Sequence, residues 1–300
     1  MTLVLGMGAR TVEFGGHYLG EMADSTPFLE DRRLLHQRLQ RDGYVLLRGV
    51  IPREPVFRAR DKVLRALAEH GLLASGLPIE LGRAATKAEG VMWRDKPAIA
   101  QSAELLGAVE APELFGFFER FFEGEVATTR HKWLRAQGPG AYTGAHMDVV
   151  YMGRGTHNLV TTWIPITEST REMGPLAILE GSHRIESLSK VRATYGKMDV
   201  DRDHVTGWFT NDPIELVDRS GARWLTTEFR PGDMLIFTIF TWHMSLTNST
   251  DRYRISCDVR WQRSDEPMDP RWFGDKPLGH YAWEKGPTKP MSEARQEWGV

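Results

Sequence analysis

The chain contains 300 residues, of which 41% are hydrophobic and 26% are charged, and its formal net charge is −2. This composition is typical of an ordered globular protein with a sizeable core, and it excludes a chain that stays disordered. The 38 basic and 40 acidic residues form no long stretch of one sign, so we expect a small-molecule ligand and no nucleic-acid partner.

Cysteine usage and hydropathy favour a cytoplasmic location. Cys257 is the single cysteine, so the chain forms no internal disulfide. The first residues lack the basic start and the long apolar run of a signal peptide. The longest apolar stretch, MLIFTIFTW at 234–242, is much shorter than the roughly 20 residues of a membrane helix. We expect no membrane partner, and the sequence leaves the oligomeric state open.

Residues 1–125 are predicted to form mostly helical support. Apolar residues at helical spacing predict helices over 27–42, 54–70 and 112–122. Between the first two of these helices, YVLLRGV at 44–50 predicts a short strand.

Residues 126–262 show the hydrophobic period of β-strands. Seven strand-like runs are separated by Gly, Pro, Asn and Asp: TTRHKWLRAQ, AYTGAHMDVV, NLVTTWIPIT, GPLAILEG, WLTTEF, DMLIFTIFTW and RYRISCDVRW. Such short, closely spaced strands predict a mainly β domain, either a sandwich or a jelly-roll barrel. We interpret the long polar insertion at 184–222 as a lid and residues 263–300 as an extension over the surface.

The stretch YTGAHMDVVY at 142–151 reads as a strand that carries His146 and Asp148. Alternate residues of a strand point to one face, so these two side chains are expected side by side. An H-x-D motif also arises by chance about once in every two chains of this size, so it needs a partner. The candidate is His243, at the end of PGDMLIFTIFTWH.

The sequence around His243 predicts a hairpin, because the turn-forming residues NSTD at 248–251 separate two strand-like runs. If the turn centres on these residues, His243 lies opposite Ser256 and Ser245 lies opposite Arg254. All four side chains would then share one face.

Two histidines and one carboxylate form the facial triad of non-haem Fe(II) oxygenases, which leaves open coordination positions for a 2-oxo acid and O₂. The far carboxylate of such a cosubstrate needs a planar, permanently charged donor, and Arg254 in an R-x-S sequence is suitable, with Ser256 as an additional donor. Zinc is the alternative metal, because His₂Asp sets also bind Zn²⁺. A hydrolytic zinc site has no need of this arginine, so we favour iron.

The motifs together resemble the phytanoyl-CoA dioxygenase family of Fe(II)/2-oxoglutarate oxygenases. From Thr128 to Gln262 the chain carries HMD, TTWIPI, EMGPLAILEGSHR, RPGDMLIF, WHMS and RYRISC in the order of that family, and DGYVLLRGVI at 42–51 resembles its opening strand. The resemblance implies a double-stranded β-helix, or jelly roll, flanked by N-terminal helices. It also implies Fe(II) as the metal, with 2-oxoglutarate and O₂ as cosubstrates.

The resemblance assigns roles to individual residues. It implies that His146, Asp148 and His243 bind the metal, and that Arg254 anchors 2-oxoglutarate. A further set, namely Ser245, Trp163 and Ser256, matches positions that contact the cosubstrate. No catalytic residue beyond the metal centre is predicted. Met147 departs from the family, in which glutamine is frequent between the two ligands.

Several other residues are candidates for the wall of a substrate cavity. Trp133, Arg135 and Gln137 alternate along one predicted strand, so they line the cavity or form an outward-facing row. A second set lies in the irregular stretch 71–100 and in the insertion: Met92, Trp93, Tyr195, Met198, Trp208 and Phe209.

We therefore expect an Fe(II)/2-oxoglutarate-dependent dioxygenase that hydroxylates a small organic substrate, favouring a secondary metabolite. An acyl-CoA hydroxylase of the same mechanism is the first alternative. A zinc-binding hydrolase or a binding module on the same barrel is the second. The substrate itself is not specified by the sequence.

Overall fold

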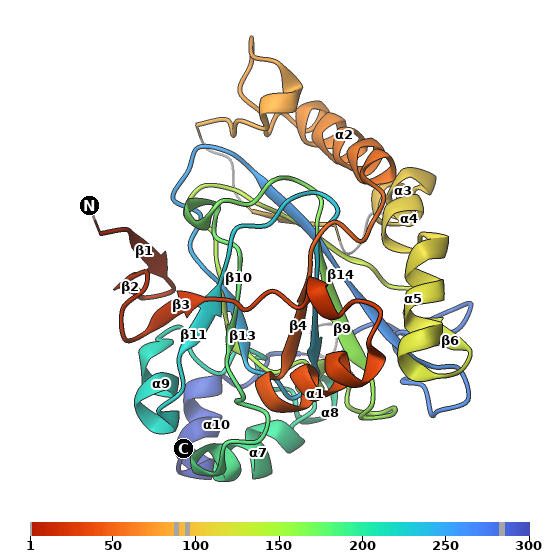
Figure 1. The fold of residues 1–300 in the computed structure, drawn as a ribbon. Helices are drawn as coiled ribbons and strands as arrows, with labels where there is room; N and C mark the ends of the chain where they lie inside the picture. The colour runs from red at the N-terminus through yellow and green to blue at the C-terminus, as the bar shows by residue number, and fades with distance from the viewer. Residues whose placement is uncertain (1, 87–89, 94–96, 282–285) are drawn as a thin grey trace.

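Two β-sheets form the centre of the molecule (Figure 1), and the computed structural model describes residues 2–86, 90–93, 97–281 and 286–300. The larger sheet has the order β4-β12-β9-β14-β7-β5, with β6 also paired to β14, and its pairs are antiparallel. Its strands are β4 (Tyr44–Leu47), β5 (Val91–Met92), β6 (Val126–Thr128), β7 (Trp133–Gln137), β9 (Val160–Pro165), β12 (Met234–Thr238) and β14 (Arg254–Arg263).

The smaller sheet has the order β3-β11-β10-β13-β8 and is antiparallel except where β3 meets β11. Its strands are β3 (Leu19–Glu21), β8 (Thr143–His146), β10 (Leu176–Leu179), β11 (Trp224–Thr226) and β13 (His243–Ser245). A separate hairpin joins β1 (Val4–Met7) to β2 (Arg10–Glu13). One apolar cluster contains Trp163 and Leu235 of the larger sheet with Ile178 and Leu225 of the smaller, so the two sheets pack face to face.

The outer face of the larger sheet is covered by N-terminal helices, most of which lie along one side of the molecule in Figure 1. They are α1 (Arg32–Asp42), α2 (Arg53–Glu69), α3 (Pro97–Ala100), α4 (Ala103–Val109) and α5 (Pro112–Phe122). Their apolar stripes share a core cluster with Ile255, Cys257, Val259 and Trp261, which are alternate residues of β14. The intervening residues of β14 therefore point to the space between the sheets.

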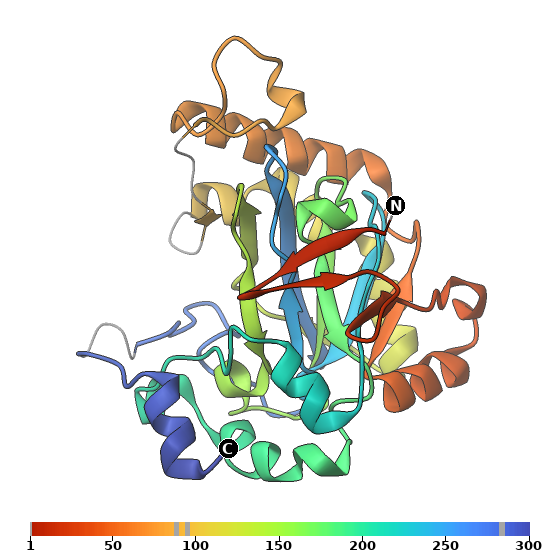
Figure 2. The same cartoon turned by 90° about the vertical axis from the view of Figure 1, so that its left-hand side faces the viewer.

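Shorter helices gather at the opposite end, around the C-terminus (Figure 2). They are α6 (Val149–Met152), α7 (Ser189–Ala193), α8 (Val200–Asp203), α9 (Ile214–Ser220) and α10 (Met291–Trp298). The remaining elements are single 3-10 turns at Thr26–Phe28, Ile79–Leu81, Arg171–Met173, Glu186–Leu188 and Tyr195–Lys197. Within the described ranges, no helix has the length and apolarity needed to cross a bilayer.

The predicted helices at 54–70 and 112–122 are confirmed within one residue by α2 and α5. The helix predicted over 27–42 begins later, at Arg32, because Asp31 caps it by accepting a hydrogen bond from the Leu34 amide at 3.0 Å. It ends as predicted at Gly43, whose φ of 82° is readily adopted only by glycine.

Two expectations about the organisation were wrong. The fold mixes α and β structure and is not mainly β. In addition, β13 and β14 do not form a hairpin, because they belong to different sheets. Residues 4–21 carry three strands that were not predicted, and the insertion at 184–222 forms five short helical segments whose apolar residues are buried against the rest of the protein.

Candidate metal centre and active site

His146 and His243 lie directly opposite each other on the neighbouring strands β8 and β13, and their ring centroids are 4.1 Å apart. Asp148 does not lie on a strand, although the sequence predicted that it would. Its φ of −66° and ψ of −23° are helical, and it precedes the first residue of α6. The chain therefore turns after His146, and this turn, not strand alternation, brings the carboxylate back to the histidine pair.

These three residues are the one group among the described residues whose His, Cys, Asp or Glu donor atoms could hold a metal, with all donor atoms within 4.8 Å of one another. Asp148 Oδ1 lies 3.9 Å from His146 Nε2 and 3.7 Å from His243 Nε2. All three side chains are buried. The spacing is that of ligand atoms around one ion.

Backbone carbonyls fix which nitrogen of each imidazole faces the centre. His146 Nδ1 lies 2.8 Å from the Gly144 carbonyl oxygen, and His243 Nδ1 lies 3.0 Å from that of Thr241. A carbonyl only accepts, so each Nδ1 carries the proton and each Nε2 presents a lone pair. Burial lowers the pKa of His146 to about 3, aided by the charge of His243, and burial also lowers the pKa of His243. Both rings are therefore neutral, as metal binding requires.

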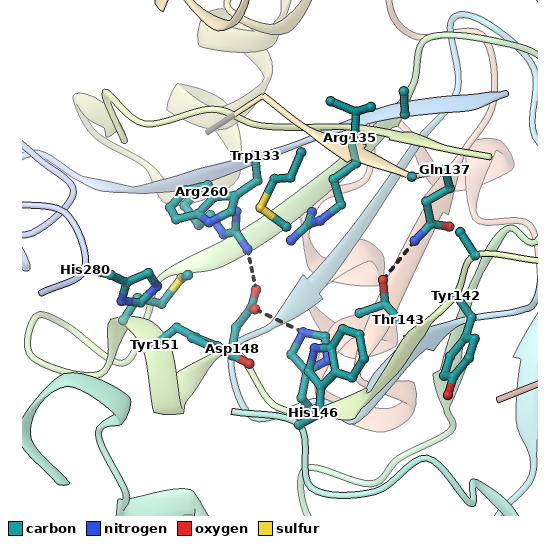
Figure 3. A pocket seen from close by; sticks show the side chains of 17 residues that line it. Trp133, Arg135, Gln137, Tyr142, Thr143, His146, Asp148, Tyr151, Arg260 and His280 are labelled. Atoms are coloured by element: carbon teal, nitrogen blue, oxygen red, sulfur yellow. Dashed lines mark hydrogen bonds and ion pairs between the residues drawn. The ribbon is translucent and has the colours of Figure 1, made fainter. Parts of the chain in front are cut away.

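One carboxylate oxygen of Asp148, Oδ2, already accepts two hydrogen bonds. Asp148 Oδ2 accepts hydrogen bonds from Thr161 Oγ1 at 2.5 Å and from Arg260 Nη2 at 2.9 Å, which leaves Oδ1 facing the histidines (Figure 3). Burial alone would raise the pKa of Asp148, but the charge of Arg260, the two imidazoles and the Thr161 hydroxyl together hold it below its ordinary value. The carboxylate is thus an anion that presents one oxygen to the centre. This donor set fits a hard or borderline divalent cation such as Fe(II).

Arg254 is a buried cation that pairs with no carboxylate among the described residues. Its Nη1 donates to Ser256 Oγ at 2.6 Å, its Nη2 donates to Gln137 Oε1, and its Nε has no hydrogen-bond partner. The Trp163 ring lies beside it, with its centroid 5.5 Å from the guanidinium carbon. Burial and the charge of Arg135 lower the pKa of Arg254 to about 9. A buried guanidinium whose hydrogen-bond partners are neutral is a site for an anionic ligand.

Gln137 connects this arginine to the smaller sheet. Its Nε2 lies 2.9 Å from Thr143 Oγ1 and 3.2 Å from Ser245 Oγ, and Ser245 Oγ accepts from the Thr143 amide at 2.7 Å. Arg254 and Ser245 therefore share one network, as predicted, but they meet across the space between two sheets and not across a hairpin. Residues predicted to contact the cosubstrate are thus together, with Gln137 as an additional member.

Comparison with known proteins gives this arrangement a family. The model of the family described as "Phytanoyl-CoA dioxygenase (PhyH)" matches residues 39–256. The chain belongs to the phytanoyl-CoA dioxygenase family. It is an Fe(II)- and 2-oxoglutarate-dependent oxygenase, and this decides against the zinc hydrolase and the binding module.

Individual relatives agree with the family assignment. A 1-deoxypentalenic acid 11-beta-hydroxylase of Streptomyces arenae is 28% identical over 256 residues, which cover 81% of this chain and 85% of that protein. The corresponding hydroxylase of Streptomyces exfoliatus is 27% identical over 262 residues, 81% of this chain and 86% of its own length. Among solved structures, the carbocyclase SnoK from nogalamycin biosynthesis has a TM-score of 0.56 at 20% identity, covering 90% of this chain and 96% of SnoK. This last likeness shows the fold.

The oxygenase has a cavity of about 480 Å³ beside the candidate ligands (Figure 3). Trp133, Arg135 and Gln137 all line it, so their alternation marks a cavity wall and not an outward row. Of the other predicted wall residues, Met92 and Trp208 line it as well. The remaining four are buried in packed clusters and do not line it: Trp93, Tyr195, Met198 and Phe209.

Two functional candidates on β14, Asp258 and Arg260, were missed at the level of sequence. They continue the alternation of Arg254 and Ser256 along β14. The run R-I-S-C-D-V-R therefore places four polar side chains on one face of a strand. Polar residues at every second position of a fully buried strand were the signal that could have found them.

Proposed function

We propose that His146 Nε2, Asp148 Oδ1 and His243 Nε2 bind the ferrous ion, and that Arg254 with Ser256 holds the distal carboxylate of 2-oxoglutarate. The observation that carries this proposal is the convergence of three metal-binding atoms, together with a buried guanidinium that lacks an anionic partner and lies on the same face of β14 as Arg260, the residue that holds Asp148. Gln137 and Ser245 complete the cosubstrate end of the site, and the Trp163 ring shields it from water.

We further propose that the two sheets form a double-stranded β-helix and that residues 1–300 are one domain. The face-to-face packing and the likeness to SnoK support this reading. Residues 1–125 support the core at 126–262, residues 184–222 close one end as a lid, and residues 263–300 extend over the surface. A cytoplasmic location is supported by the lone, buried Cys257.

When bound, iron and 2-oxoglutarate use O₂ to oxidise a C–H bond to an alcohol, with release of succinate and CO₂. The protein supplies position, neutral ligands and a dry cavity. The two Nδ1 hydrogen bonds to carbonyls hold the imidazole planes, and Thr161 with Arg260 holds the carboxylate. Phe237, whose ring centroid is 4.6 Å from that of His243, excludes water from the inner side of the centre.

The substrate is proposed to be a small secondary metabolite. The two similar hydroxylases act, by their names, on 1-deoxypentalenic acid, and a cavity of about 480 Å³ suits a molecule of moderate size. The acyl-CoA alternative has less support, because the described lining residues include no lysine and no glycine-rich phosphate loop.

Anaerobic titration tests the proposal. Adding Fe(II) and 2-oxoglutarate to the protein should produce the weak visible charge-transfer band of the chelate. Arg254→Ala should weaken 2-oxoglutarate affinity by roughly tenfold or more, because a charge-assisted contact is lost. The exposed Arg58→Ala serves as the control. Absence of the band in the wild-type protein, or equal 2-oxoglutarate affinity in Arg254→Ala, contradicts the proposal.

A further inference from the structure

The cavity wall carries more positive than negative charge. Arg135, Arg260 and Asp148 line the cavity, and Arg254 and Asp258 lie on the same face of β14 as Arg260, so three arginines stand against two carboxylates. The formal charges of these five side chains leave one positive charge over. A ferrous ion and doubly charged 2-oxoglutarate add two charges of each sign, so the same excess remains in the loaded site.

Neighbouring carboxylates do not remove this excess. Asp199, Asp201 and Asp269 lie behind His280, and each accepts a hydrogen bond from Arg271, which is fully buried among them. They are held within their own cluster, which ties α8 to the C-terminal extension. The uncompensated charge therefore belongs to the cavity.

Arg135 is the arginine in the cavity wall whose guanidinium is most accessible to a ligand. Its side chain is 19% exposed, whereas Arg254 and Arg260 are only 1% and 2% exposed. Arg135 Nη1 pairs with Asp258 Oδ2, and its other guanidinium nitrogens form no hydrogen bond with any described residue. Figure 3 shows the guanidinium reaching down into the pocket toward His146 and Asp148. Burial and the charge of Arg260 lower the pKa of Arg135 to about 10, so it stays charged at neutral pH.

The remainder of the wall is largely apolar or aromatic. It is lined by Val91, Met92, Trp133, Tyr142, Met152 and Trp208. In such surroundings a single cation is poorly hydrated, so an anionic group brought by the ligand would bind it strongly. The wall thus suits a molecule with an apolar skeleton and one acidic group.

We propose that Arg135 binds a carboxylate of the substrate, and that the enzyme accepts apolar monocarboxylic acids in preference to neutral molecules of the same skeleton. This inference rests on the proposed function and adds the chemical class of the substrate and the residue that selects it. The other source of a carboxylate is the cosubstrate. Arg254 takes the distal carboxylate of 2-oxoglutarate and the metal takes the proximal one, so Arg135 is left for the substrate.

Binding of matched acids and esters tests this inference. Cyclic terpenoid acids, including 1-deoxypentalenic acid, and long-chain fatty acids are titrated with their methyl esters by anaerobic calorimetry into protein that contains Fe(II) and 2-oxoglutarate. At least one acid should bind roughly ten- to hundredfold more tightly than its ester, because the ester loses the charge-assisted contact. Arg135→Gln should abolish this preference, and Arg135→Lys should keep part of it.

Arg135→Gln also leaves Asp258 buried without a counter-charge, which could unfold the protein. The double variant Arg135→Gln with Asp258→Asn removes both charges, and it should lose the preference for acids while it keeps a cooperative thermal transition. Formation of the Fe(II)–2-oxoglutarate band reports the proposed function separately in every variant.

Two results would overturn the inference. One is equal binding of acids and esters throughout the panel while the wild-type protein still forms the band. The other is a loss of 2-oxoglutarate affinity in Arg135→Gln with the preference for acids intact, which would assign Arg135 to the cosubstrate. Failure of the band itself would instead count against the proposed function.

Discussion

Arg260 and Thr161 face each other on the neighbouring strands β14 and β9, and both donate to the same oxygen of Asp148. Arg260 is held in turn by Trp133, whose ring centroid lies 3.8 Å from the guanidinium carbon. One oxygen of the carboxylate is therefore saturated before any metal binds, and the other is aimed at the histidine pair. Such support around a ligand keeps a metal site ready for its ion.

The first prediction is that Arg260→Met weakens metal binding. Without the guanidinium, Asp148 is free to rotate and loses its partner charge, so the affinity for Mn(II) should fall by roughly ten- to hundredfold. Titration followed by electron paramagnetic resonance of free Mn(II) measures this. Arg263→Met, on the same strand but paired with the exposed Asp265, is the matched control. If Arg260→Met lowers thermal stability but leaves Mn(II) affinity unchanged, Arg260 supports only the fold.

A second prediction concerns stabilisation by metal. Three buried donors that converge on one point bind an ion only when the chain is folded, so Mn(II) should raise the thermal unfolding midpoint. A chelator should reverse the rise. In Asp148→Ala the rise should disappear, because the remaining imidazoles lack the charged ligand. A rise of the same size in Asp148→Ala would mean that the metal binds elsewhere.

The third prediction uses Gln137, the residue opposite Arg254 on β7. Gln137→Glu places a carboxylate against the guanidinium, where it competes with the cosubstrate. We expect unchanged or higher thermal stability but at least tenfold weaker 2-oxoglutarate binding. Gln137→Leu, of similar size but without charge, should weaken 2-oxoglutarate less and lower the stability. Band titrations and thermal melts separate the two effects, and equal 2-oxoglutarate affinity in both variants would exclude competition by the new charge.

The sequence could predict the site better than the way in which the strands assemble it. His146, Asp148, His243 and Arg254 were recognisable because metal and carboxylate binding restrict residue type and order. Their placement was not, because strand periodicity does not show which sheet a strand joins. The turn at 248–251 passes between sheets and does not close a hairpin, and the chain leaves β8 immediately after His146.

Contacts between distant segments explain the remaining differences. Arg260 and Asp148 are 112 positions apart, and no local pattern links them. The strands at residues 4–21 were missed because they are three or four residues long and have too few positions to show a period. The insertion at 184–222 is rich in charged residues, yet its apolar residues are buried. Ion pairs such as Arg154–Asp199 compensate the charged side chains that are buried with them.

The last prediction concerns that polar cluster and its dependence on pH. Burial by itself would raise the pKa of Asp199, but hydrogen bonds from Arg154 and the Arg202 amide, with the charge of Arg271, hold it below its ordinary value. A carboxyl whose pKa is lower in the folded state stabilises the protein above its unfolded pKa of about 3.9, and this stabilisation is lost as the pH falls through the folded value. The free energy of unfolding should therefore decrease below about pH 4. Arg271→Met removes the buried cation that Asp199, Asp201 and Asp269 share, so it should cost about 3–5 kcal/mol at neutral pH. It should also reduce the acid-dependent loss, because the pKa of Asp199 would then lie nearer its ordinary value. Urea unfolding at several pH values measures both effects, with Arg58→Met as the control for a surface pair with Glu54. If the free energy of unfolding decreases as steeply at low pH in Arg271→Met as in the wild-type protein, the cluster does not govern stability at low pH.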